Sequence, residues 1–278
     1  MKLITILVPC YNEEQAVRLF HKRLCATINT LSASYDFEIL FINDGSIDET
    51  ANIIRELQAT DNRVAYVSLS RNFGKEVALL AGFDYAKGDA VVTIDADLQH
   101  PPEIIPDMLK LWESGYADVY AERISRDTDS FFRKIATVLY YKVLKNIADE
   151  PLDMGSYDFR LLDRRCINAL CELRELCRYT KGLFSWIGYR KISIPYEVAP
   201  RVAGEASYTL IKRVHLAIDG VLSSSILPLR VASFCGVAIS MFAFIYLVIT
   251  LITTLVYGNP TAGWTSTLVI ILFGSSLV

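Results

Sequence analysis

The first hundred residues alternate apolar segments with segments of helical pattern, and this alternation constrains the fold more than any other feature. Four apolar segments predict strands, near residues 3–10, 36–44, 64–70 and 89–95. Strands that are apolar throughout and separated by helices are typical of a parallel sheet covered on both faces. The sequence therefore predicts an α/β fold for this part of the chain.

Three helices are expected between these strands. The segments that predict them are 13–31, 46–58 and 74–88. Ser46 or Asp48 is the expected N-cap of the second helix, because short polar side chains bind free amides at helix starts. Gly88 is the expected end of the third helix, since glycine commonly ends helices.

Polar residues follow each predicted strand. The four clusters read PCYNE, NDGS, SRNFGKE and DADLQ. In open α/β sheets, ligands bind beyond the carboxyl ends of the strands. The sequence therefore predicts one binding site at this edge of the sheet.

Asp95 and Asp97 close the fourth strand and indicate what the site binds. Carboxylate oxygens suit hard cations such as Mg²⁺ or Mn²⁺, which complete their shell with water and phosphate oxygens. A metal-bound diphosphate fits this pair, whereas a solvated strand end is the alternative. The chain has neither the GxGxxG fingerprint of dinucleotide sites nor the GxxxxGK[ST] of P-loop proteins.

Charge and cysteine content exclude some classes of protein. The formal net charge of −3 gives no support for bulk nucleic-acid binding. The six cysteines form no CxxC pair, so a reduced, buried set is expected.

The last part of the chain predicts a membrane region. Residues 231–278 contain no Asp, Glu, Lys or Arg. A span needs about 20 apolar residues, so one full span is expected near 229–257. A second span is expected from about 264, stopping short of that length as if truncated. A buried hairpin of a soluble protein is the alternative.

An interfacial helix is expected just before the first span, over residues 206–227. Its apolar residues recur at helical spacing next to Lys212 and Arg213. These two residues and Arg230 precede the span, and the turn after it has no basic residue. The positive-inside rule then places residues 1–205, the expected catalytic domain, in the cytoplasm.

The four polar clusters, in their order and wider context, resemble glycosyltransferase family 2, which has the GT-A fold. The matching stretches are VPCYNEE, FINDGSIDET, LSRNFGKEVALLAGFDYAKGD and DADLQHPPE. The resemblance implies a Rossmann-like, mostly parallel sheet and a site for a nucleotide sugar with Mg²⁺ or Mn²⁺. The implied nucleotide-sugar residues are Pro9, Tyr11, Asn12, Glu13, Asp44, Lys75, Asp95 and Gln99.

The same resemblance implies that Asp97 and Asp95 hold the metal and that both are catalytic. Structural alternatives stay open for three neighbouring residues. Asn43 and Gly45 are also typical of turns, and Glu13 also suits a helix N-terminus.

The middle of the chain indicates an acceptor. Basic residues flank a wide aromatic face at 123–141, as suits an anionic lipid at a membrane surface. An ordinary core helix is the alternative. The candidate lipid-phosphate residues are Arg123, Arg126, Ser130, Arg133 and Arg201. The stretch CRYTKGLFSWIGYR resembles a family segment near the sugar and acceptor, which makes Arg178 and Lys181 candidates there, and Arg160 matches the family stretch DFRLL.

Asp158, in the family-like stretch DFRLL, is the candidate base or acceptor-orienting residue. A phosphate monoester is largely ionised at pH 7, with its second pKa near ~6, so a strong base is less necessary. The alternative for Asp158 is an ion pair with Arg160.

A GT-A domain followed by spans resembles the polyprenyl-phosphate glycosyltransferases, nearest to the bactoprenol glucosyl group. This implies inverting transfer of glucose from UDP-glucose to undecaprenyl phosphate, by an integral protein of a bacterial inner membrane acting in cell-envelope synthesis. A homotetramer is expected by the same analogy. The alternatives are a dolichyl-phosphate mannose synthase-like enzyme using GDP-mannose, a processive polysaccharide synthase, and a non-catalytic protein. The chain lacks the QxxRW motif of processive synthases.

Overall fold

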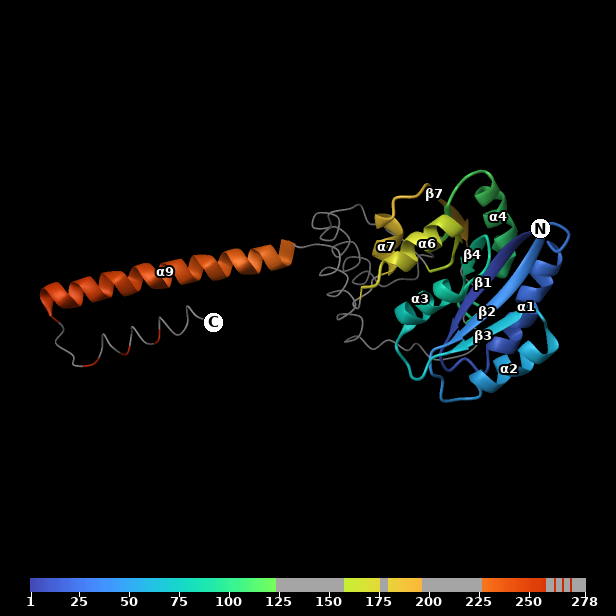
Figure 1. Cartoon of the computed structure of the whole chain (residues 1–278), viewed down its shortest axis with the longest axis horizontal. Coiled ribbons are helices and arrows are strands. Elements are labelled where there is room, and N and C mark those ends of the chain that lie inside the picture. Colours follow the sequence, from blue (N-terminus) through green and yellow to red (C-terminus); the bar gives the residue numbers. More distant parts are fainter. Residues whose placement is uncertain are drawn as a thin grey trace, which may run out of the picture. The chain divides into compact units, whose positions relative to one another are not determined.

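A computed structural model describes residues 1–123, 158–175, 180–196 and 227–258, with single residues at 263, 267 and 271. The chain divides into two compact units, Met1–Ser224 and Ser225–Val278. Figure 1 shows the elements of each unit.

The first unit is built on a seven-stranded mixed sheet. The strands are β1 (Lys2–Cys10), β2 (Tyr35–Asn43), β3 (Val64–Ser68), β4 (Ala90–Thr93), β5 (Asp118–Arg123), β6 (Arg160–Asp163) and β7 (Lys191–Tyr196). Their order is β3-β2-β1-β4-β6-β5-β7. Only β6 runs antiparallel to its neighbours, β4 and β5. The predicted α/β, mostly parallel, GT-A-type sheet is confirmed.

Helices cover both faces of this sheet (Figure 1). One face carries α1 (Val17–Asn29), α2 (Thr50–Thr60) and α4 (Ile105–Glu113), the last preceded by a short 3-10 turn, η1 (Pro102–Ile104). The other face carries α3 (Lys75–Tyr85), α6 (Arg164–Glu172) and α7 (Thr180–Trp186).

The sequence of strand β1 is apolar throughout because both of its faces are covered. Its side chains alternate between the faces: Ile6 is buried in the same cluster as Phe20 of α1, whereas Leu7 is buried in the same cluster as Phe83 of α3. Both kinds of position are therefore buried, as expected for a sheet covered on two sides.

Each of the three predicted helices has a boundary that differs from the prediction, and α1 begins at Val17 rather than at residue 13. Helix α2 begins at Thr50 with Glu49 at its N-cap, so neither predicted cap is correct. Ser46 instead accepts a hydrogen bond from the Asn12 amide, and Asp48 accepts from the Glu14 and Thr50 amides. Helix α3 ends at Tyr85, before Gly88. At Gly88 a Cβ would lie 2.5 Å from the Thr5 nitrogen, so the glycine permits close contact with β1.

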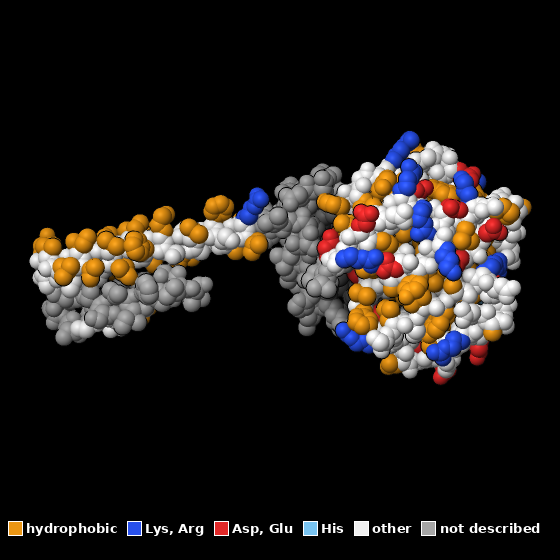
Figure 2. Space-filling view, viewed as in Figure 1, with side chains coloured by type: hydrophobic (Ala, Val, Ile, Leu, Met, Phe, Trp, Pro, Cys, Tyr) orange, Lys and Arg blue, Asp and Glu red, His pale blue; other side chains and the backbone are white. Residues whose placement is uncertain are grey.

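The described part of the second unit contains a long helix, α9 (Leu227–Tyr257). Its stretch Leu229–Tyr257 has 29 residues and contains an 18-residue window with a mean hydropathy of 2.5, so its length and composition are suitable for crossing a membrane. At 1.5 Å per residue such a helix exceeds a bilayer core of about 30 Å. Hydrophobic side chains lie along its surface (Figure 2). The helix predicted near 229–257 is therefore present, while the predicted interfacial helix and second span fall largely outside the described residues.

Candidate active site

Three charged side chains meet at the carboxyl edge of the sheet. The Lys75 Nζ atom lies 2.6 Å from Asp95 Oδ1 and 2.7 Å from Asp158 Oδ2. Lys75 opens α3, Asp95 follows β4 and Asp158 precedes β6. Strand pairing explains the meeting: Thr93 pairs with Arg160 in an antiparallel ladder, so two residues further on Asp95 lies opposite Asp158.

This group, which we call the Lys75 triad, keeps its cation. Burial disfavours the charged ammonium, but Asp158 and then Asp95 outweigh it and raise the pKa of Lys75 above its ordinary value. Two carboxylates and one ammonium leave a formal charge of −1. The three side chains are about one quarter to one third exposed, so a solute can reach them.

The loop after Asp95 is bent sharply. The Asp97 side chain is nearly buried, and its Oδ1 accepts a hydrogen bond from the Gln99 amide at 3.0 Å. Leu98 has a φ of 62°, and Asn12, in the loop after β1, has a φ of 55°. Among the described residues these are the non-glycine residues with positive φ. Such conformations are uncommon and cluster at functional sites, and both lie at this edge.

His100 is a site residue that the sequence analysis missed. Its ring stacks on Phe159 with centroids 5.3 Å apart, and its Nδ1 lies 3.8 Å from Asp95 Oδ2. That nitrogen is buried and has no hydrogen-bond partner within the described part of the chain. Burial lowers the pKa of His100, so the ring is mostly neutral at pH 7. The available signal was its position, directly after DADLQ.

The donor set at this edge fits a divalent ion. Asp95 and Asp97 supply carboxylate oxygens, and the His100 Nδ1 atom lies 3.8 Å from Asp95 Oδ2. Asp95 already holds a cationic group, the Lys75 ammonium, on both of its oxygens. Carboxylate oxygens suit Mg²⁺ or Mn²⁺, so the chemistry of Asp95 and Asp97 fits such an ion. Metal binding by Asp95 and Asp97 stays a prediction.

Asp44 shapes the neighbouring loop. Its two carboxylate oxygens accept hydrogen bonds from the Phe73 amide at 2.7 Å and the Gly74 amide at 2.8 Å. Gly45, with a φ of 65°, lies where a Cβ would be 2.2 Å from the Arg71 carbonyl carbon. Asp44 and Gly45 therefore fix residues 71–74, which lead directly into Lys75. Direct contact of Asp44 with a nucleotide stays a prediction.

The loop after β1 is joined to the loop after β2. Asn12 Oδ1 accepts from the Ile47 amide at 3.0 Å, and Thr50 Oγ1 accepts from the Glu13 amide at 2.8 Å. Tyr11 is 43 % exposed, and Pro9 lies near the end of β1. The residues predicted to line a nucleotide pocket are thus gathered at one edge, although their contacts with a nucleotide are predictions.

Arg160 forms an ion pair with Asp118, a partner that the sequence did not indicate. Its Nη1 donates to Asp118 Oδ2 at 2.9 Å, with both side chains 2 % exposed, and its guanidinium lies 3.7 Å from the Phe184 ring centroid. The partner that the structure gives Asp158 is Lys75, and an ion pair between Asp158 and Arg160 stays an alternative. Burial of the pair with Asp118 gives Arg160 a structural role, away from the solvent-accessible triad.

The remaining predicted residues cannot be located at this edge. Arg126, Ser130, Arg133, Arg178 and Arg201 lie outside the described residues. For Arg123, the last residue of β5, and Lys181, in α7, the structure describes the secondary structure only. Their predicted contacts with sugar or lipid phosphate stay predictions.

Comparison with known sequences identifies close relatives. Residues 5–170 match the pattern of Glycosyl transferase family 2. The chain is 40 % identical over 272 residues to the bactoprenol glucosyl transferase of Shigella phage SfV, covering 97 % of this chain and 87 % of that protein. It is also 39 % identical over 274 residues to an uncharacterized glycosyltransferase of Bacillus subtilis (strain 168), covering 99 % and 84 %.

Solved structures share the fold at much lower identity. Glucosyl-3-phosphoglycerate synthase from Mycobacterium tuberculosis, in complex with Mn²⁺, UDP and phosphoglyceric acid, superposes with a TM-score of 0.57. The two are 18 % identical, and the match covers 80 % of this chain and 78 % of that one.

Proposed function

Since the chain belongs to glycosyltransferase family 2, we propose that it transfers glucose from UDP-glucose to a polyprenyl phosphate at a membrane surface. The Lys75 triad carries this proposal, because it presents ionised, accessible groups at the sheet edge where nucleotide ligands bind in α/β folds. Relatives named as bactoprenol glucosyl transferases support the sugar and the lipid. The apolar helix α9 supports a membrane location.

The reaction forms one bond and breaks one. A phosphate oxygen of the lipid attacks C1 of glucose, the bond from C1 to the UDP oxygen breaks, and UDP leaves with the electron pair. Attack from the opposite side inverts the configuration at C1. Because the lipid phosphate is already ionised at neutral pH, no side chain has to remove a proton from it.

Positioning is then the main task of the chain's own residues. Lys75 holds Asp95 and Asp158 together, so Asp158 acts as an orienting group at the acceptor side. Asp44 and Gly45 hold the loop that sets the start of α3. A divalent ion on Asp95 and Asp97 would neutralise charge on the diphosphate leaving group, and the Mn²⁺–UDP complexes of fold relatives support such an ion.

The acceptor side follows from the predicted basic residues. Arg123, Arg126, Arg133 and Arg201 would neutralise the lipid phosphate, with Ser130 as a further donor. With the basic residues before α9 on the cytoplasmic side, the catalytic unit would face the cytoplasm of a bacterium. Assembly as a homo-oligomer is part of this proposal.

A donor screen tests the proposal. Membranes containing the chain, undecaprenyl phosphate and Mg²⁺ or Mn²⁺ are incubated with labelled UDP-glucose, UDP-galactose or GDP-mannose. We expect an acid-labile, lipid-extractable product with UDP-glucose, absent after chelation and absent in Asp97→Asn. A lipid product with GDP-mannose alone would show that the donor is that of the mannose synthase class. The absence of a lipid product with every donor would overturn the proposal.

A further inference from the structure

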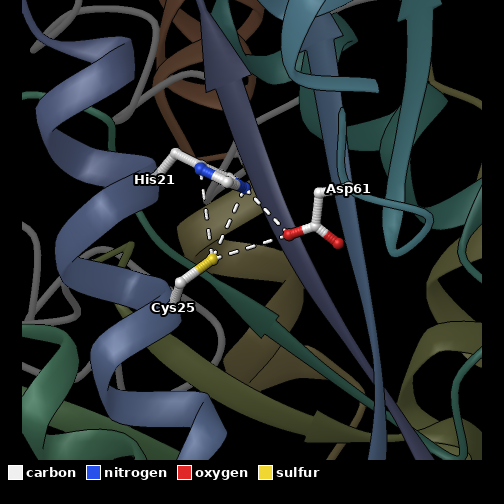
Figure 3. A group of neighbouring side chains, drawn as sticks. All are labelled: His21, Cys25 and Asp61. Atoms are coloured by element: carbon white, nitrogen blue, oxygen red, sulfur yellow. Dashed lines mark hydrogen bonds and ion pairs between the residues drawn. The ribbon is translucent and has the colours of Figure 1, made fainter. Parts of the chain in front are cut away.

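A second cluster of metal-ligating side chains lies outside the catalytic edge. His21 and Cys25 are one turn apart on α1 and point to the same side, toward Asp61 at the C-cap of α2 (Figure 3). Asp61 precedes the start of β3, whereas the Lys75 triad follows the carboxyl ends of the strands. The proposed glycosyl transfer uses none of these three residues.

The three donor atoms already have the spacing of a metal site. His21 Nε2 lies 3.2 Å from Asp61 Oδ2 and 3.4 Å from Cys25 Sγ, and Sγ lies 3.7 Å from the same Oδ2. Tetrahedral zinc, with bonds of about 2.0–2.3 Å, needs these ligand atoms about 3.3–3.6 Å apart. A nitrogen, a sulfur and an oxygen thus form a triangle that a zinc ion fits with small adjustments.

Arg63 contacts two of the three proposed ligand residues, Asp61 and Cys25. Its Nε donates to Asp61 Oδ1 at 2.9 Å, and its Nη2 donates to Oδ2 at 2.8 Å and to Cys25 Sγ at 3.3 Å. A metal on Oδ2 and Sγ has to displace the two Nη2 bonds. The Nε bond to Oδ1 can persist, so Arg63 orients the carboxylate as outer-shell partners do. Its positive charge also favours the Cys25 thiolate, the form that binds metals.

Protonation at pH 7 suits one ligand and opposes another. Burial lowers the pKa of His21, which leaves the imidazole neutral and able to coordinate. Burial raises the pKa of the Cys25 thiol, so a metal has to displace its proton. Because metal binding releases this proton, the apparent affinity should increase by up to about tenfold for each unit that the pH rises toward that pKa.

We propose that His21, Cys25 and Asp61 bind a zinc-class divalent ion, with water in the fourth position. Borderline metals prefer such mixed nitrogen, sulfur and oxygen ligands, unlike the hard ions that suit Asp95 and Asp97. The side chains of His21 and Asp61 are 14 % and 15 % exposed, so solvent can reach the open position. The ion would tie α1 to the turn between α2 and β3 and would stabilise the fold.

Cobalt absorption tests the site on the full chain in detergent. Co²⁺ bound to a thiolate gives a charge-transfer band in the near ultraviolet, which carboxylate-bound Co²⁺ lacks. We expect a band that saturates at one Co²⁺ per chain, is lost on adding Zn²⁺, and is absent in Cys25→Ser. The matched control Cys171→Ser, another partly buried cysteine, should keep the band, as should Asp97→Asn, which alters the proposed catalytic metal site.

Further measurements test whether the variants remain folded and whether the three residues form only a hydrogen-bond network without metal affinity. His21→Gln keeps the thiol but loses a ligand, and should weaken Co²⁺ binding at least tenfold while keeping a native circular-dichroism spectrum. Zn²⁺ should raise the melting temperature of the wild type and of Cys171→Ser, but not of Cys25→Ser. A network without metal affinity would give no saturable band up to millimolar Co²⁺. That result, or an unchanged band in Cys25→Ser, would overturn the proposal.

Discussion

At the scale of single residues, Lys75 decides the arrangement of the catalytic edge. It joins Asp95 to Asp158, which come from different strands. We predict that Lys75→Gln lowers kcat/KM for glucosyl transfer about 100-fold, because two carboxylates that repel each other lose their common partner and shift. The free energy of unfolding should fall by only about 1 kcal/mol, since the group is partly exposed.

The measurement is lipid labelling at several UDP-glucose concentrations, together with thermal unfolding. Lys110→Gln is the matched control, because it removes a lysine from an exposed ion pair with Asp107. It should change neither quantity. If Lys75→Gln kept more than half of the wild-type kcat/KM, the triad would have no part in positioning.

Gly45 gives a second residue-scale prediction. Gly45→Ala would combine a positive φ with a Cβ 2.2 Å from the Arg71 carbonyl carbon, so loop 71–74 would have to move. Gly115→Ala is the matched control. Gly115 also has a positive φ, yet a Cβ at this position would meet nothing within 4 Å. We expect a loss of about 1–2 kcal/mol at Gly115 and at least twice that at Gly45, measured by denaturant unfolding. Equal losses would contradict the proposed backbone contact.

The sequence predicted the site's location better than its internal contacts. The position of Asp95, Asp97 and Asp44 at this edge could be predicted, because polar residues follow apolar strands in a parallel sheet. The link between Lys75 and Asp158 could not be found, because it depends on β6 entering the sheet antiparallel beside β4. His100 was missed because a lone histidine after a motif gives no spacing signal, and its stacking on Phe159 is a tertiary contact.

At the scale of elements, the apolar runs predicted the strands well, while helix ends were predicted less well. Ser46 resembles a cap in sequence, but it binds the Asn12 amide across to another loop. The Ser46 side chain, which local rules assign to the helix N-cap, therefore makes a tertiary hydrogen bond instead. The strands β5, β6 and β7 lie beyond the alternating region, and no local pattern indicated their order.

The buried pair between β5 and β6 gives the element-scale prediction. Asp118→Ala would leave the Arg160 guanidinium, 2 % exposed, without this carboxylate. Removing one partner of a buried pair typically costs about 3–5 kcal/mol, so we expect a loss of that size in denaturant unfolding. Glu56→Ala, which breaks the exposed pair with Arg18, should lose less than about 1 kcal/mol. A small loss in Asp118→Ala would show that the pair does not join these strands.

At the scale of the whole molecule, the described residues of the two units differ in how they bury apolar side chains. The first unit buries its apolar residues in two clusters around a sheet. In the second, the 18-residue apolar window of α9 has no buried share in the structure. Soluble proteins rarely leave so large an apolar surface in water, and this exposure of α9 supports the proposed membrane location. This inference was available from composition alone.

The last prediction tests α9 as a span. Two arginines at its centre, Ile239→Arg and Ala243→Arg, would cost about 5–7 kcal/mol on insertion scales. Two at its ends, Val231→Arg and Val256→Arg, can reach the interface and should cost little. Epitope tags before Met1 and after Gly258 report the outcome by protease protection. We expect the tags on opposite sides of the membrane in the wild type and the end variant, and on the same side in the central variant. Tags on the same side in the wild type would mean that α9 does not cross.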